Sequence, residues 1–153
     1  MSSSASLNAG LRCAMNAYEY TIAARIKHPS IDPAVVTEAL GLQPQHSWKA
    51  GAARRTPTGE PLEGRYRESY WTAQIVDAER ISSTEMPLEV ALAQSVALLQ
   101  KNEKFLAKVA DEGGSAELFI GIFGAGNLGI ELPPTLLARF GRLGVAISLD
   151  IYP

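Results

Sequence analysis

The chain has 153 residues, of which 46% are hydrophobic, and a formal net charge of -2. This length suits one domain with a single buried core, and the near-balanced charge argues against nucleic acid or an anionic membrane as partner. A single cysteine, Cys13, excludes an internal disulfide, and two histidines are too few for a convincing zinc site. We therefore expect a cytoplasmic protein without metal, cofactor or membrane span.

Residues 1–17 are small and polar and lack the continuous apolar core of a secretory signal. We expect a disordered leader there, followed by one domain over residues 18–153. The domain opens with apolar and polar residues in alternation from Tyr18 to Lys27, the period of a half-buried strand. His28 follows at the strand exit, where it is expected to be a solvated turn residue.

A helix is predicted next, because Asp32 suits its N-cap, Pro33 its first turn and Gly41 its left-handed end. A short extended piece over residues 47–49 follows. Residues 51–68 then form the longest irregular stretch, with three glycines and two prolines. Since this stretch is longer than an ordinary connection, it is mobile, functional or partly a hairpin.

The second half of the chain carries more regular signals. Residues 69–76 are rich in aromatic and β-branched side chains and predict a strand. Apolar residues recur at helical spacing over 88–109, with room for a break near Asn102. Three elements complete the chain: a strand over 117–123, a helix over 134–143 and a closing strand over 145–152.

In the closing strand the residues Val145, Ile147, Leu149 and Ile151 alternate as the set expected to face the core. The full order is then β-α-β-β-α-β-α-β. Helices that all connect to one twisted sheet suggest an α+β two-layer sandwich, close to a ferredoxin-like unit with a C-terminal αβ extension.

The glycines at 124–129 spell G-x-G-x-x-G after a predicted strand, and Asp150 follows about twenty residues later, as in a dinucleotide fingerprint. That fingerprint requires a helix that starts directly at the glycines. Here Pro133 and Pro134 fall where such a helix would be in its second turn, and proline there removes donors and clashes with the preceding turn. We therefore interpret the run as a glycine-rich connection to a short helix.

Reactive side chains are sparse in this sequence. Cys13 lies in the predicted leader, far from both histidines, so a Cys-His pair is not indicated. His46 lies beside Trp48 and is the better histidine candidate. Asp150, between two apolar neighbours, is expected to cap a helix or bind an arginine as a structural group.

Three segments carry a family likeness: residues 31–51 with Leu40-Gly41-Leu42-Gln43-Pro44, the strand bearing Trp71, and residues 132–152 with the ending Leu149-Asp150-Ile151-Tyr152. In this order they resemble the bacterial family catalogued as domain of unknown function forty-two seventy-nine. The resemblance extends from Tyr18 to the end. It implies a small, stand-alone bacterial domain with no established activity and no catalytic residues to carry over.

Residues 43–68 hold the one local charge signature. Five cations against three carboxylates give this segment a charge of +2 in a chain whose total is -2. Guanidinium forks beside aromatic rings are typical of anion, peptide and single-stranded nucleic-acid sites, although no broad basic face accompanies them here. The alternative is a solvated loop beside core tryptophans. The candidate ligand-binding residues are His46, Trp48, Lys49, Arg54, Arg55, Arg65 and Arg67.

We accordingly expect a non-catalytic binding or interaction module for a protein partner or a small anionic ligand. One alternative is an enzyme that uses the Gly124–Gly129 loop or the region of His46 and Trp48. The other is a module that associates with itself as a homodimer through an exposed strand edge.

Overall fold

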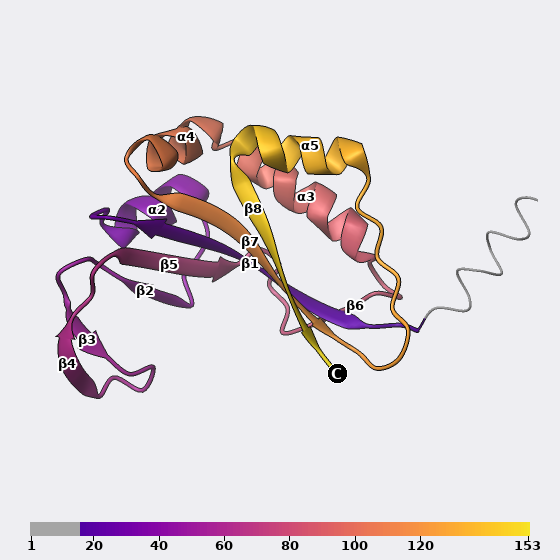
Figure 1. Ribbon diagram of the computed structural model, residues 1–153, viewed down its shortest axis with the longest axis horizontal. Helices are drawn as coiled ribbons and strands as arrows, with labels where there is room; N and C mark the ends of the chain where they lie inside the picture. The colour runs from indigo at the N-terminus through magenta and orange to yellow at the C-terminus, as the bar shows by residue number, and fades with distance from the viewer. Residues whose placement is uncertain (1–15) are drawn as a thin grey trace, which may run out of the picture.

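The first strand, β1 (Glu19–His28), lies in the middle of a mixed sheet in a computed structural model that describes residues 16–153 (Figure 1). The strand order is β2-β5-β1-β7-β8, and the short β6 also pairs with β1. β7 and β8 are parallel, and the other neighbours are antiparallel. The further strands are β2 (His46–Trp48), β5 (Ser69–Gln74), β6 (Ile81–Ser82), β7 (Ser115–Phe123) and β8 (Val145–Tyr152).

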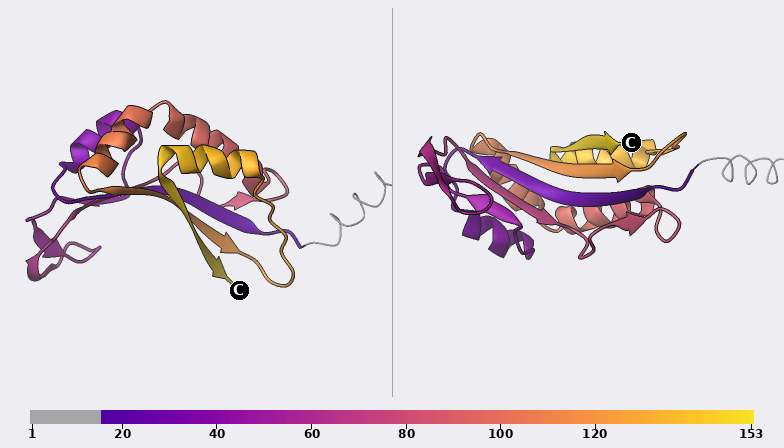
Figure 2. Two further views of the ribbon diagram at one scale, coloured as in Figure 1. Left: turned by 45° about the horizontal axis from the view of Figure 1, so that its top comes forward. Right: turned by 90° about the horizontal axis from the view of Figure 1, so that it is seen from below.

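The helices lie along one face of this sheet (Figures 1 and 2). They are α2 (Pro33–Leu40), α3 (Leu88–Gln100), α4 (Glu103–Asp111) and α5 (Pro134–Leu143). Beneath them the apolar half of β1 is buried, including Tyr20, Ile22 and Ile26. Period-two alternation therefore fixes which face of β1 contacts the helices, and the predicted α+β class is confirmed.

Local signals set several element ends as predicted. The Asp32 Oδ1 atom accepts a hydrogen bond from the Ala34 amide at 3.0 Å, and Gly41 ends α2 with a φ of 67°. The long helical stretch is broken around Asn102, whose amide donates to the Leu99 carbonyl at 3.0 Å. Gly114 follows α4 because a Cβ there would lie 2.6 Å from the Lys27 carbonyl oxygen.

The irregular stretch over residues 51–68 is largely a β-hairpin, one of the three alternatives that the sequence left open. Its strands are β3 (Ala53–Arg55) and β4 (Pro61–Arg65), which form a two-stranded sheet of their own. The turn is closed where the Thr56 amide donates to the Glu60 carbonyl at 2.8 Å. This hairpin projects from the main sheet on the side away from the helices (Figure 2, left).

Burial along β8 differs from the prediction. Val145 is only 6% exposed, but Leu149 is 49% and Ile151 is 62% exposed, so the outer half of the strand does not face a packed core. β8 is the last strand of the sheet and runs away from α5 (Figure 1), so no described helix covers that half. Alternation predicted the correct face of the strand, but it could not predict how far the helices extend.

His28 also differs from its predicted role as a solvated turn residue, because it is 4% exposed. Its Nδ1 atom accepts hydrogen bonds from the amides of Ser30 and Ile31 at 3.0 and 2.8 Å. The proton therefore sits on Nε2, which lies 3.6 Å from the Glu112 carboxylate. The imidazole fixes the turn that leads into α2.

The predicted leader lies outside the described residues, apart from Asn16 and Ala17, and so does Cys13. Within residues 16–153 no helix combines the length and apolar character needed to cross a membrane.

Candidate binding face of the sheet

The second face of the sheet, which we call the open face, carries the side chains that alternate with the buried ones. The register of β1 with β7 sets Arg25 opposite Glu117 and Ala23 opposite Phe119. The register of β7 with β8 sets Phe119 beside Ser148 and Gly121 beside Asp150. In the described part of the chain the helices lie on the other side (Figure 2). Polar and aromatic groups from strands distant in sequence therefore meet on one surface.

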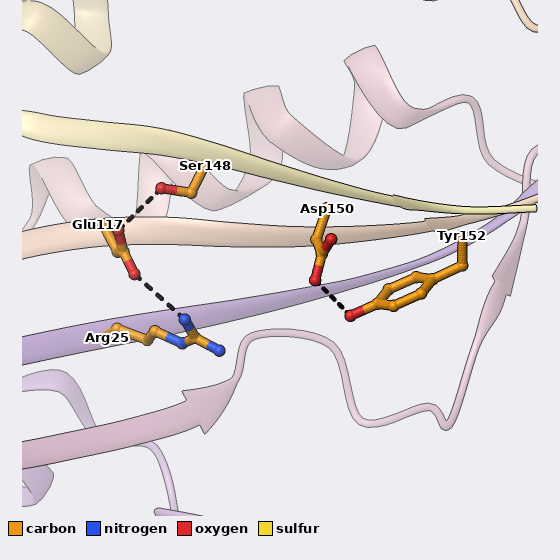
Figure 3. Close-up of polar contacts among 5 residues, drawn as sticks. All are labelled: Arg25, Glu117, Ser148, Asp150 and Tyr152. Carbon is orange, nitrogen blue, oxygen red and sulfur yellow. Dashed lines mark hydrogen bonds and ion pairs between the residues drawn. The ribbon is translucent and has the colours of Figure 1, made fainter.

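Arg25 is held on this face by Glu117 and Phe119, and Ser148 in turn holds Glu117; Figure 3 shows the contacts of Glu117. Its Nη1 atom lies 3.4 Å from Glu117 Oε1, and its guanidinium carbon lies 3.7 Å from the centre of the Phe119 ring. The Ser148 hydroxyl donates to the other Glu117 oxygen at 2.8 Å. Arg25 Nε is buried without a hydrogen-bond partner within residues 16–153. The guanidinium thus lies over the Phe119 ring beside Glu117, and its buried donor, Nε, is unused.

A second cluster lies further along the same strands. The Tyr152 hydroxyl donates to the Asp150 carboxylate (Figure 3). This hydrogen bond, which ionisation of the hydroxyl would remove, is the main cause of the raised pKa of Tyr152, and repulsion by the Asp150 charge adds to it. The Tyr152 ring stacks on Phe123 at 4.9 Å between centres, and the Arg80 guanidinium lies 3.7 Å from the centre of the Phe123 ring. Asp150 therefore bonds a tyrosine, so the expected helix cap or arginine partner was wrong.

An aromatic stack connects the projecting hairpin to the sheet. The Trp48 ring is stacked between Tyr66 and Tyr70, with both centre-to-centre distances at 4.5 Å. The Tyr66 hydroxyl also accepts from the Arg55 amide and donates to the Arg55 carbonyl, each at 3.1 Å. Both faces of Trp48 are therefore covered by protein. The tryptophan positions the hairpin and leaves no free ring face for a ligand.

The hairpin arginines bond to backbone carbonyls. Arg54 donates to Glu63 at 3.4 Å, Arg55 to Gly59 at 3.3 Å and Arg65 to Gly51 at 2.7 Å. Each contact uses one Nη1 donor and leaves the positive charge uncompensated. Within residues 16–153 no carboxylate lies within 4.0 Å of these three groups, of Lys49 or of Arg67. His46 lies on β2, two residues before Trp48. Its side chain is exposed, and its backbone position pairs with Thr72 of β5.

The glycine run does not form a phosphate-binding turn. α5 begins at Pro134, five residues after Gly129, as the two prolines predicted. The amides of Leu136 and Leu137 already donate to the Pro133 carbonyl at 3.0 and 3.1 Å, so the first turn offers few free donors. The loop instead contacts the start of the described chain, where the Asn16 amide donates to the Asn127 carbonyl at 3.1 Å.

Comparison with known families gives one match. The model of the domain of unknown function (DUF4279) matches residues 18–153, nearly the whole described domain. The chain belongs to this family. Searches of curated proteins and of solved structures gave no match. Membership in DUF4279 confirms the predicted resemblance, and the family's description assigns no activity.

Sequence reasoning identified the hairpin cations but missed the cluster around Arg25. A signal was present, because alternation in β1 already set Arg25 on the polar side, and the same alternation in β7 applies to Glu117. The sequence does not reveal that β1 pairs with β7 and that β7 pairs with β8. Those pairings bring Arg25, Glu117 and Ser148 together from positions up to 123 residues apart.

Proposed function

We propose that this DUF4279 domain is a non-catalytic binding module that holds an anionic group at the hairpin end of its open face. The anionic group belongs to an acidic segment of a protein partner or to a small molecule. The observation that carries the proposal is the absence of carboxylate partners, within residues 16–153, for the cations of the hairpin and its flanks.

Guanidinium chemistry supports an anionic ligand. Arg54 and Arg55 each keep most of their donors free, because one Nη1 contact to a carbonyl is the side-chain bond that each makes. A free planar fork matches carboxylate or phosphate oxygens in a bidentate manner. The stack of Tyr66, Trp48 and Tyr70 fixes the base of the hairpin to the sheet. The arginine donors therefore lie on a positioned hairpin rather than on a flexible loop.

Binding is favoured over catalysis because three groups suited to acid-base roles, His28, Glu117 and Asp150, are already engaged. His28 Nδ1 accepts two amide hydrogens, which leaves no lone pair for a substrate proton. Asp150 accepts from Tyr152, and Glu117 accepts from Ser148 and pairs with Arg25. These contacts orient the strands and leave none of these three groups as a free base.

We also propose that the first part of the domain is a ferredoxin-like unit, to which α5 and β8 are added. Support comes from the order β7-β1-β5-β2 and from antiparallel pairing between every pair of neighbours in that set. A cytoplasmic location remains our proposal on the basis of the single cysteine.

The double variant Arg54→Ala with Arg55→Ala tests the binding site. Two probes are used, inorganic pyrophosphate and a short fluorescent oligoglutamate peptide, so that small-molecule and protein-like anions are distinguished. We expect the wild-type chain to bind at least one probe, the double variant to bind about tenfold or more weakly, and wild-type binding to weaken as salt rises. The melting midpoint should stay nearly unchanged, since exposed substitutions cost within about 0.5 kcal/mol.

The matched control is Lys101→Ala with Lys104→Ala, which removes two exposed cations near the junction of α3 and α4. This control should bind like wild type, because its charges lie on the helical side of the sheet. Equally weakened probe binding in both double variants would show that the effect depends on net charge alone, and it would contradict a site at the hairpin. Unchanged binding in the arginine variant would place the working surface elsewhere.

The enzyme alternative is tested with dinucleotides. Saturating NAD(H) or NADP(H) should leave the melting midpoint unchanged, because α5 begins with Pro134 and the amides of Leu136 and Leu137 are already engaged, so few donors are free. A rise of several degrees in the melting midpoint would instead support the Gly124–Gly129 loop as a cofactor site.

A further inference from the structure

The two edges of the main sheet are not equivalent. β2 has three residues and is followed by the charged Lys49, so it offers little for another strand to pair with. β8 has eight residues, and its register with β7 is continuous from Val145 to Tyr152. It contains no proline, lysine or arginine, and its one charged residue is Asp150. β8 therefore lacks the devices that normally prevent a sheet edge from pairing.

The direction of the backbone groups along β8 follows from one hydrogen bond. The Gly124 amide donates to the Tyr152 carbonyl at 3.3 Å, so the backbone groups of Tyr152 point toward the β7 side. The N–H and C=O of successive residues in a strand point to opposite sides. Ile147, Leu149 and Ile151 therefore direct their N–H and C=O groups outward, away from β7. In the described chain no strand lies on that side.

The same three residues carry side chains on the helix side of the sheet. Leu149 lies beside Ile120 and Ile151 lies beside Ile122, and both β7 residues are fully buried. Leu149 and Ile151 themselves are 49% and 62% exposed. The apolar layer under the helices thus continues into β8 and then ends in open solvent. Unpaired backbone groups and exposed apolar side chains coincide on one short stretch.

We propose that a second copy of this chain pairs antiparallel with β8, about a two-fold axis that passes beside Leu149. Leu149 then lies opposite its own counterpart, and Ile147 lies opposite Ile151 of the second copy. All of these residues have outward backbone groups, so they form hydrogen-bonded pairs with about six bonds across the interface. The two sheets become one, and the exposed leucines and isoleucines of both copies cover one another.

We infer that the pairing strand belongs to a second copy of the chain because β8 is complementary to itself. With the axis beside Leu149, Asp150 faces the small, uncharged Ser148 of the second copy, and bulky Tyr152 faces the small Ala146. An axis beside Asp150 would instead set two carboxylates opposite each other, which is unfavourable. An isologous pair requires one surface that matches itself after a half-turn, and β8 meets that condition on both faces of the sheet.

The test measures mass in solution by sedimentation equilibrium, from about 1 μM to about 1 mM, for the full chain and three variants. Leu149→Pro removes an outward N–H without removing a donor to β7, and proline is tolerated at that side of an edge strand. Leu149→Lys places a charge in the apolar row. Leu137→Lys is the matched control, because Leu137 is 44% exposed but lies on α5.

We expect a wild-type dimer, a dimer of Leu137→Lys, and at least a tenfold weaker association of both Leu149 variants, with far-ultraviolet circular dichroism like that of wild type. Hydrogen exchange should also show the Leu149 amide more protected at high than at low wild-type concentration. A wild-type chain that stays monomeric throughout the range overturns the proposal. A dimer that survives both Leu149 substitutions overturns it as well, because another surface then holds the copies together.

Discussion

The two faces of the sheet use the same strands for different purposes. On the helix side, Ile120 and its neighbours on β1 are buried in a continuous apolar layer. On the open face, the Arg25 guanidinium lies over the Phe119 ring, and Glu117 contacts both Arg25 and Ser148. Residues adjacent in sequence therefore differ in what they contribute. The helix side supplies the hydrophobic free energy of folding, and the open face carries polar and aromatic groups.

Among the changes that compare the two faces, removal of β8 should destabilise the domain most. A chain that ends at Gly144 loses buried Val145 and half-buried Ile147, and it exposes β7 on its outer edge. We expect no cooperative thermal transition from that chain. A chain that ends at Leu149 keeps the inner residues of β8 and should unfold cooperatively. A sharp transition of the shorter chain near the full-length midpoint would show that β8 is peripheral.

Two neighbouring substitutions in β7 compare the faces directly. Ile120→Ala should lower the free energy of unfolding by about 2–5 kcal/mol, because it leaves a cavity in a fully buried site. Phe119→Ala should cost about 1 kcal/mol, since the half-buried ring mainly supports the Arg25 guanidinium. Urea titrations of the two variants measure the difference. Equal losses would mean that the open face is as tightly packed as the helix side.

Alkaline pH should weaken the helix side through Tyr20. Burial, with added repulsion from Tyr18 and Glu89, raises the pKa of Tyr20 to about 12 from 10.0. Between these pH values the unfolded chain releases the proton while the folded chain keeps it, so the free energy of unfolding falls as pH rises from 10 toward 12. Tyr20→Phe should show a shallower decline. Its midpoint at neutral pH should also be lower, because the hydroxyl donates to the Met86 carbonyl at 2.7 Å.

The smallest effect is expected for Glu117→Gln on the open face. Both partners of the Arg25 and Glu117 ion pair are partly exposed, at 31% and 29% of the side chain, so solvent screens the interaction. The loss should stay within about 1 kcal/mol and should shrink further in high salt. A loss of several kcal/mol, insensitive to salt, would show that this cluster contributes to folding as much as a core residue does.

Much of the fold could be predicted because its signals are local. Alternation in β1, the cap at Asp32 and the glycine at Gly41 depend on near neighbours, and the structure confirms each. The bounds of α5 follow from Pro134 and Gly144 for the same reason. Backbone dihedral preferences and periodic burial act over a few residues, so a sequence alone is sufficient to reveal them.

The hairpin cations were equally visible, since Arg54 and Arg55 stand in a stretch without apolar periodicity. Their surroundings were not visible. The sequence placed Trp48 among the ligand-binding candidates, whereas Tyr66 and Tyr70 cover both of its faces. The stack depends on the pairing of β2 with β5 and on the return of the hairpin, which join residues that are far apart in the chain.

The sequence by itself determined the main helices and strands, the family and the apolar faces of β1 and β8, because these follow from local periodicity and short motifs. It did not predict β6, and it left the hairpin of β3 and β4 as one of several alternatives. The tertiary structure decided which apolar residues are covered, as Leu149 and Ile151 show. It also decided that His28 is buried and that Arg25, Glu117 and Ser148 meet. Coverage and long-range contact depend on strand register and on the reach of the helices, which no single segment encodes.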